Sequence, residues 1–145
     1  MSTEQDKALV RQFIDEIFNR GNMRMVDQYF AADFVEHEEL PAGIPRDRDG
    51  VVQLTTMLRT AFPDFTATID DIIAEGDKVV IRMTWRGTQE GEFLGIPPTG
   101  KSISIGVIDI IRMADGKAVE HWGQMDSMGM MQQLGAIPAP AEGGA

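Results

Sequence analysis

The spacing of apolar residues changes at Pro63, and this change limits the possible folds more than any other feature of the sequence. Before Pro63, apolar residues such as Leu9, Phe13 and Ile17 recur every three or four positions, which is the period of an amphipathic helix. After Pro63, apolar and polar residues alternate, which is the period of strands with one buried face. Helices followed by an antiparallel run of strands predict an α+β fold, with the N-terminal helices packed on one face of a curved antiparallel sheet.

Local signals mark where the predicted elements begin and end. Ser2 and Gln5 have the spacing of a capping box at the start of the first helix, and Gly21 suits its end. Pro63 stops the last N-terminal helix, and the run 114–117 has the composition of a hairpin turn. The sequence therefore predicts helices near residues 3–20, 23–29 and 49–62, strands near 34–37, 65–69, 79–86, 103–113 and 119–126, and a helical turn near 128–134.

Length and composition exclude several classes of protein. A chain of 145 residues fits one domain, predicted over 1–137, and the Pro-, Ala- and Gly-rich run 138–145 is predicted to be a flexible tail. A net charge of −10 without a basic run argues against nucleic acid and membrane surfaces as partners. The sequence has no cysteine, no signal peptide and no apolar run of membrane-spanning length, so we expect a cytoplasmic protein.

Polar side chains fall where a purely structural sheet would be apolar. Asp109 interrupts an inward row of apolar residues in the strand 103–113. In the last strand, strict alternation puts Glu120, Trp122, Gln124 and Asp126 on the inner face and His121 on the outer face. Carboxylates and tryptophans that point into a concave apolar space are typical of a ligand pocket or an active site.

Several short motifs resemble a known family. They are Ala61-Phe-Pro-Asp64, Ala74-Glu-Gly-Asp77, Trp85-Arg-Gly-Thr88, Gly91-Glu-Phe-Leu-Gly-Ile-Pro-Pro-Thr-Gly-Lys101, and Asp115-Gly-Lys-Ala-Val-Glu-His-Trp122 with Asp126. From about Lys7 to Leu134 the chain resembles the SnoaL-like polyketide cyclases of the nuclear-transport-factor-2-like superfamily. The resemblance implies a cone-shaped fold. It also implies ring closure by intramolecular aldol addition without a metal or an organic cofactor.

The resemblance assigns the acid/base carboxylate to Asp126, which could instead cap the turn that begins at Ser127. His37 and Asp109 are the other predicted catalytic residues, where they would orient or polarise the substrate. Asp109 could also belong to a structural ion pair, and His37 could lie at the rim. Gln89 stands where many members of the family have histidine, which puts the chemistry in question. The predicted substrate-binding residues are Trp85, Trp122, Tyr29, Phe18, Phe93 and Gln124.

No cofactor or metal is predicted, because the two histidines lack the spacing of metal ligands and lie on opposite faces by alternation. The preferred function is cyclisation of a small polyketide-like ester, or related lyase or isomerase chemistry. One alternative is a non-catalytic protein that binds a small hydrophobic or aromatic molecule. Another is a cofactorless epoxide hydrolase, which would need Arg82 or Arg112 to point inward, whereas alternation places both outside.

The open face of the sheet is predicted to form a homodimer interface, because it is too apolar in part to face water alone. Its residues are Arg82, Thr84, Ile108, Ile110 and Val119.

Overall fold

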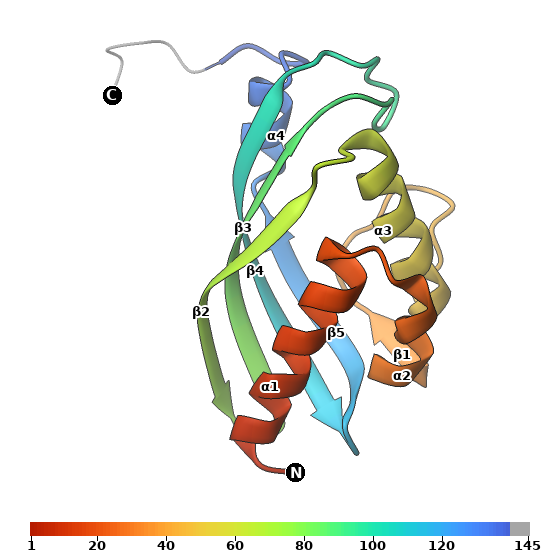
Figure 1. The fold of residues 1–145 in the computed structure, drawn as a ribbon, viewed down its shortest axis with the longest axis vertical. Helices are drawn as coiled ribbons and strands as arrows, with labels where there is room; N and C mark the ends of the chain where they lie inside the picture. Colours follow the sequence, from red (N-terminus) through yellow and green to blue (C-terminus); the bar gives the residue numbers. More distant parts are fainter. Residues whose placement is uncertain (140–145) are drawn as a thin grey trace.

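The N-terminal helices cover one face of a strongly curved sheet in the computed structural model, which describes residues 1–139 (Figure 1). The helices are α1 (Thr3–Phe13), α2 (Val26–Tyr29), α3 (Arg48–Ala61) and α4 (Ser127–Gln133), with a π-helical turn η1 (Ile14–Asn19) and a 3₁₀ turn η2 (Met23–Met25). The strands are β1 (Phe30–Glu36), β2 (Thr66–Glu75), β3 (Lys78–Thr88), β4 (Ser102–Ala114) and β5 (Lys117–Met125). The predicted α+β architecture is confirmed.

The first helix forms where the sequence predicts it. The Ser2 side chain accepts a hydrogen bond from the Gln5 N–H, and the Gln5 side chain accepts one from the Ser2 N–H, so the capping box is present. The helix continues as η1 and ends before Gly21, which has a φ of +70°. Arg59 of α3 donates to the carbonyl oxygens of Phe18 and Asn19 at 2.9 and 2.8 Å, so α3 satisfies the end of η1.

The sheet has the order β1-β5-β4-β3-β2. Strands β2 to β5 form the predicted antiparallel meander, and Asp115 and Gly116 make the β4–β5 turn with φ angles of +52° and +79°. The short strand β1 pairs with β5 in parallel. This pairing joins segments about 85 residues apart in sequence, so no local signal predicts it.

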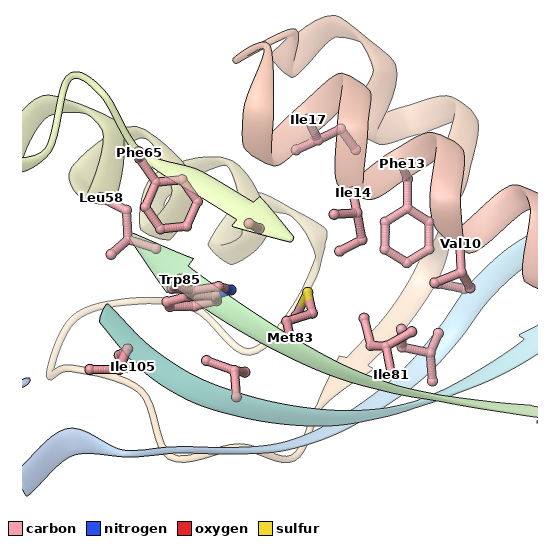
Figure 2. Close-up of a cluster of buried hydrophobic side chains, with 14 of the residues drawn as sticks. Val10, Phe13, Ile14, Ile17, Leu58, Phe65, Ile81, Met83, Trp85 and Ile105 are labelled. Carbon is pink, nitrogen blue, oxygen red and sulfur yellow. The ribbon is translucent and has the colours of Figure 1, made fainter. Parts of the chain in front are cut away.

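The apolar core lies between the helices and the inner face of the sheet. Figure 2 shows Val10, Phe13 and Ile14 of the N-terminal helix above Ile81 and Met83 of β3. The predicted inner faces of β3 and β4 are confirmed. Their buried members are Val79, Ile81, Met83 and Trp85 in β3, and Ile103, Ile105, Val107, Asp109, Ile111 and Met113 in β4.

The hairpin between β4 and β5 contains one extra residue in β5. Met113 pairs with Ala118, but the next pair joins Arg112 to Glu120, so Val119 has no counterpart in β4. Because side chains alternate between the faces of a strand, a one-residue bulge turns every following side chain to the opposite face.

The bulge at Val119 overturns the predicted faces of β5. Strict alternation predicts His121 on the outer face and Trp122 and Gln124 on the inner face. Instead, His121 pairs with inward-facing Ile111, while Trp122 and Gln124 lie on the outer face. These assignments were wrong because strict alternation takes no account of a bulge.

The tail predicted over 138–145 lies mostly outside the described residues. Within residues 1–139, no helix is long and apolar enough to cross a membrane.

Candidate active site

A narrow apolar cavity lies between the helices and the inner face of β3, β4 and β5. Its volume is about 60 Å³. The apolar lining residues are Phe13, Ile14, Phe18, Phe30, Phe34, Leu40, Val51, Leu54, Val107 and Ile111.

Three carboxyl groups meet around His121 in this cavity. The Nδ1 atom of His121 is 2.6 Å from Glu36 Oε1, and its Nε2 atom is 2.9 Å from Asp109 Oδ1. Glu38 lies further away, with Oε2 4.0 Å from Nδ1. The side chains of Glu36, Asp109 and His121 are only 9, 11 and 15% exposed. One imidazole is therefore held between two buried carboxylates, with a third close by.

The strand pairing explains why these residues converge. In β1, Glu36 pairs with His121, and alternation from buried Phe34 turns Glu36 and Glu38 toward the cavity. In β4, Asp109 lies opposite Gly123, which has no side chain to separate it from the rest of the cluster. Three neighbouring strands thus each supply part of one polar group.

The ion pairs keep His121 protonated far above the ordinary range of a histidine. Burial by itself lowers the pKa of an imidazole, but the hydrogen bonds and charges of Asp109 and Glu36 outweigh burial and raise the pKa of His121 to about 10. At neutral pH both ring nitrogens therefore carry hydrogen and donate to carboxylates.

Two further buried polar atoms, in residues that line the cavity, have no hydrogen-bond partner among residues 1–139. They are Trp85 Nε1 and Thr55 Oγ1, in residues that are 8 and 1% exposed. Figure 2 shows the indole nitrogen of Trp85 on the side of the ring that faces Met83. Buried polar atoms without partners are rare and destabilising, so these two atoms are candidates for contact with a bound molecule.

Comparisons with known proteins agree with this architecture. The family model for SnoaL-like polyketide cyclases matches residues 8–134. The chain belongs to this family. It is 30% identical to the nogalonic acid methyl ester cyclase of Streptomyces nogalater, over 81% of this chain and 89% of that protein. It is also 30% identical to the aklanonic acid methyl ester cyclase DnrD of Streptomyces peucetius, over 93% of this chain and 92% of that protein.

Solved structures give the same fold for this SnoaL-like chain. TsrD from Streptomyces laurentii superimposes with a TM-score of 0.85 at 32% identity, covering 94% of this chain and 99% of that one. IdmH from Streptomyces antibioticus superimposes with a TM-score of 0.78 at 36% identity, covering 90% of this chain and 99% of that one.

The cavity contains only some of the residues predicted from the SnoaL-like sequence. Asp109, Trp85 and Phe18 line it, as predicted. Tyr29 and Phe93 are buried but are not among its lining residues. The Tyr29 hydroxyl donates to Gln12 Oε1 at 3.3 Å, and Phe93 packs edge-on against Phe62.

Three predicted site residues lie on the outer face of the sheet. His37 stacks on Trp122 with ring centroids 4.8 Å apart, and Gln124 lines the same outer depression. Alternation from Phe34 places Glu36 on the inner face and His37 on the outer face of β1. The sequence therefore contains the signal for the outer position of His37.

Asp126 does not line the cavity. It is exposed and caps α4, where its Oδ1 accepts a hydrogen bond from the Gly129 N–H at 2.9 Å. The expected inward placement was wrong, and the capping alternative describes its position.

Gln89 likewise lies outside the cavity. Its Nε2 donates to the carbonyl oxygens of Gly91 and Ile96 at 3.1 and 3.0 Å, and its Oε1 accepts from the N–H and hydroxyl of Thr99. The side chain is fully buried within the loop that joins β3 and β4. Glutamine in place of histidine at position 89 therefore changes none of the residues that line the cavity.

Sequence reasoning missed His121, Glu36, Glu38 and Thr55 as site residues. Glu36, Glu38 and His121 have potential ligand atoms within 4.8 Å of one another, so they could be considered as metal ligands. However, His121 Nδ1 is at hydrogen-bonding distance from Glu36 Oε1, and the raised pKa of His121 keeps this nitrogen protonated, so it donates a hydrogen bond and offers no lone pair to an ion. The arrangement fits a proton-sharing cluster, and the absence of a metal stays a prediction.

Proposed function

We propose that the protein is a cofactor-independent cyclase that closes a ring in a small polyketide-like ester by intramolecular aldol addition. The observation that carries this proposal is the group of carboxylates held around His121 in an otherwise apolar cavity. Similarity to proteins named as methyl ester cyclases supports it.

The chemistry requires one group that removes a proton and one that returns it. A carbon between a ketone and an ester carries an acidic hydrogen. When a carboxylate takes that proton, the C–H electron pair moves into an enolate. The enolate carbon then attacks a second carbonyl carbon of the same molecule, a C–C bond forms, and the new alkoxide takes up a proton. A carboxyl group in an apolar site suits both steps.

The unpaired polar atoms of the cavity supply contacts for such a molecule. The indole N–H of Trp85 can donate to a ketone or ester carbonyl, and the Thr55 hydroxyl can donate or accept. Asp109 would face the reacting carbon together with the other carboxylates.

The test is a conversion assay with aromatic methyl esters that carry a β-keto ester chain and a second carbonyl group. Aldol addition changes no mass, so NMR should follow loss of the acidic C–H signals and appearance of a carbinol carbon. Conversion by the protein without added metal or cofactor supports the proposal. Saturable binding of these esters without conversion would instead favour the non-catalytic binding protein.

The epoxide hydrolase alternative finds no support in the positions of the arginines. Arg82 pairs with Asp71 at 2.7 Å and Arg112 with Glu120 at 3.1 Å, both away from the cavity. An arginine inside the site, which this chemistry needs, is missing from the cavity lining formed by residues 1–139.

Replacing Thr55 by valine should stabilise the empty protein and weaken ligand binding. The change removes a buried hydroxyl without a partner, so we expect the free energy of unfolding to rise by about 1 kcal/mol. The ligand would lose one hydrogen bond, so its dissociation constant should rise roughly three- to tenfold. Urea unfolding and calorimetric titration measure both effects. The matched control is Thr56→Val, at the neighbouring exposed position of α3. A variant that binds tighter would contradict the assigned contact.

We also propose that two copies pair through the outer face of the sheet. Ile108 is 52% exposed there, beside a depression of about 690 Å³ whose lining includes Ile110 and Trp122. Sedimentation should detect a dimer, and Ile108→Lys should shift it toward monomer. A wild-type chain that stays monomeric at high concentration would end this proposal.

A further inference from the structure

Among the three carboxyl groups of the cluster, that of Glu38 accepts the fewest hydrogen bonds. Both ring nitrogens of His121 are engaged, by Glu36 and Asp109. Glu36 Oε1 also accepts from the Glu38 N–H at 2.9 Å. Within residues 1–139, no hydrogen bond reaches the Glu38 carboxyl itself. His121 therefore has no free N–H to offer a substrate, whereas both oxygens of Glu38 are available.

The backbone of Glu38 is fixed even though its carboxyl is free. Its N–H donates to Glu36, and its carbonyl oxygen accepts from Arg46 Nη1 at 3.1 Å. The side chain is 21% exposed and lines the cavity. The main chain of Glu38 is thus held in place, while its carboxyl reaches both the cavity and solvent. A group that transfers protons needs both properties.

Gly123 provides the space into which this carboxyl projects. A Cβ atom built on Gly123 would lie 2.5 Å from Asp109 Oδ1 and 2.9 Å from Glu38 Oε2. Both oxygens therefore occupy the volume that any other residue would fill at this position. A glycine inside a strand commonly marks such a close approach.

We propose that Glu38 is the proton-transfer group of this site, with Gly123 making room for its carboxyl beside Asp109 and His121 holding the neighbouring carboxylates. This proposal rests on the proposed cyclase function, which it deepens by assigning the step. The C–H bond of the substrate breaks, its proton passes to a Glu38 oxygen, and its electron pair forms the enolate. After the C–C bond forms, the Glu38 O–H returns the proton to the new alkoxide.

The surroundings of Glu38 suit it to this exchange. Burial raises the pKa of the Glu38 carboxyl; the charge of His121 opposes burial, and Asp109 and Glu36 add to the increase, which brings the pKa to about 7. Asp47, at the start of α3, is the other ionisable side chain lining the cavity. A group that exists in both forms at neutral pH can take and return a proton without a large energetic penalty.

The experiment compares Glu38→Gln with Glu39→Gln, a neighbouring exposed glutamate outside the cavity lining. The first readout is deuterium uptake at the acidic carbon of methyl acetoacetate in D₂O, followed by NMR, because it reports proton removal alone. The second readout is ring closure of the aromatic keto esters. Circular dichroism and melting temperature confirm that each variant is folded.

Glu38→Gln should slow the reaction on the order of 10²–10⁴-fold, whereas Glu39→Gln should stay within about twofold of wild type. The wild-type rate should rise with pH to a plateau, with an apparent pKa near 7, and Glu38→Gln should lack this rise. Glu38→Asp keeps a carboxyl and should retain the rise at a lower plateau. A merely structural role would move the melting temperature but leave the pH profile in place.

The two readouts separate failure of this proposal from failure of the cyclase function. Deuterium exchange that depends on Glu38, without ring closure, keeps the assignment of Glu38 and removes the cyclase function. Ring closure that survives Glu38→Gln keeps the function and overturns Glu38. A wild-type protein that catalyses neither reaction overturns both.

Discussion

Replacing His121 by glutamine is expected to lower the free energy of unfolding by about 3–5 kcal/mol near pH 6.5. In the folded protein, His121 bears the charge that compensates Glu36 and Asp109, which lie 2.6 and 2.9 Å from its ring nitrogens. Glutamine is similar in size and can hydrogen-bond to one of them, but it carries no charge. The carboxylates would then be buried together without a counter-charge, the costly outcome when one partner of a buried pair is removed.

The stability lost in His121→Gln depends on pH because folding raises the pKa of His121. The pKa of His121 is raised from 6.5 to about 10 on folding. Its contribution to stability is therefore complete below pH 6.5 and is lost as the pH rises toward 10. The difference between wild type and His121→Gln should be largest near pH 6.5 and should shrink steadily as the pH approaches 10.

Urea unfolding at pH 6.5 and pH 9.5 measures this difference. The companion variant is His37→Gln, because His37 is the other histidine and lies on the outer face, 3.9 Å from Glu120. An exposed pair of this kind contributes at most about 1 kcal/mol, so the companion should show a small loss. Equal stability of wild type and His121→Gln at pH 6.5 would show that the ion-paired cluster does not form in solution.

Replacing Gln89 by leucine is expected to destabilise the protein by about 2–3 kcal/mol. The leucine fills a similar volume but forms none of the hydrogen bonds that Gln89 makes with Gly91, Ile96 and Thr99. The Gln89 side chain is completely buried, so the backbone groups left without partners are partly shielded from water. The loop between β3 and β4 should loosen as a result.

Thermal and urea unfolding of Gln89→Leu give the size of this effect, with Gln53→Ala on the exposed side of α3 as the control. Because Gln89 does not line the cavity, the affinity of the folded variant for keto esters should stay close to that of wild type. A variant of normal stability that no longer binds ligand would mean that position 89 belongs to the site after all.

Local physical chemistry determined most of the secondary structure. Ser2 with Gln5 set the start of α1, Pro63 ended the helical region, and Asp115 with Gly116 formed the hairpin turn. Period-two alternation placed Asp109 in the interior correctly, because β3 and β4 pair without a bulge. These features depend on residues close in sequence, so the sequence itself contains the signal.

The site needed information that no local pattern contains. The bulge at Val119 turned His121 inward and Trp122 outward, and it is visible only in the pairing of β5 with β4. The parallel pairing of β1 with β5 brought Glu36 and Glu38 beside His121. Alternation predicts which residues of a single strand lie on the same face. Only tertiary packing decides which strands lie side by side and in which register they pair. The sequence by itself therefore determined the helices, the meander and the inward Asp109, and the tertiary structure decided which residues surround it.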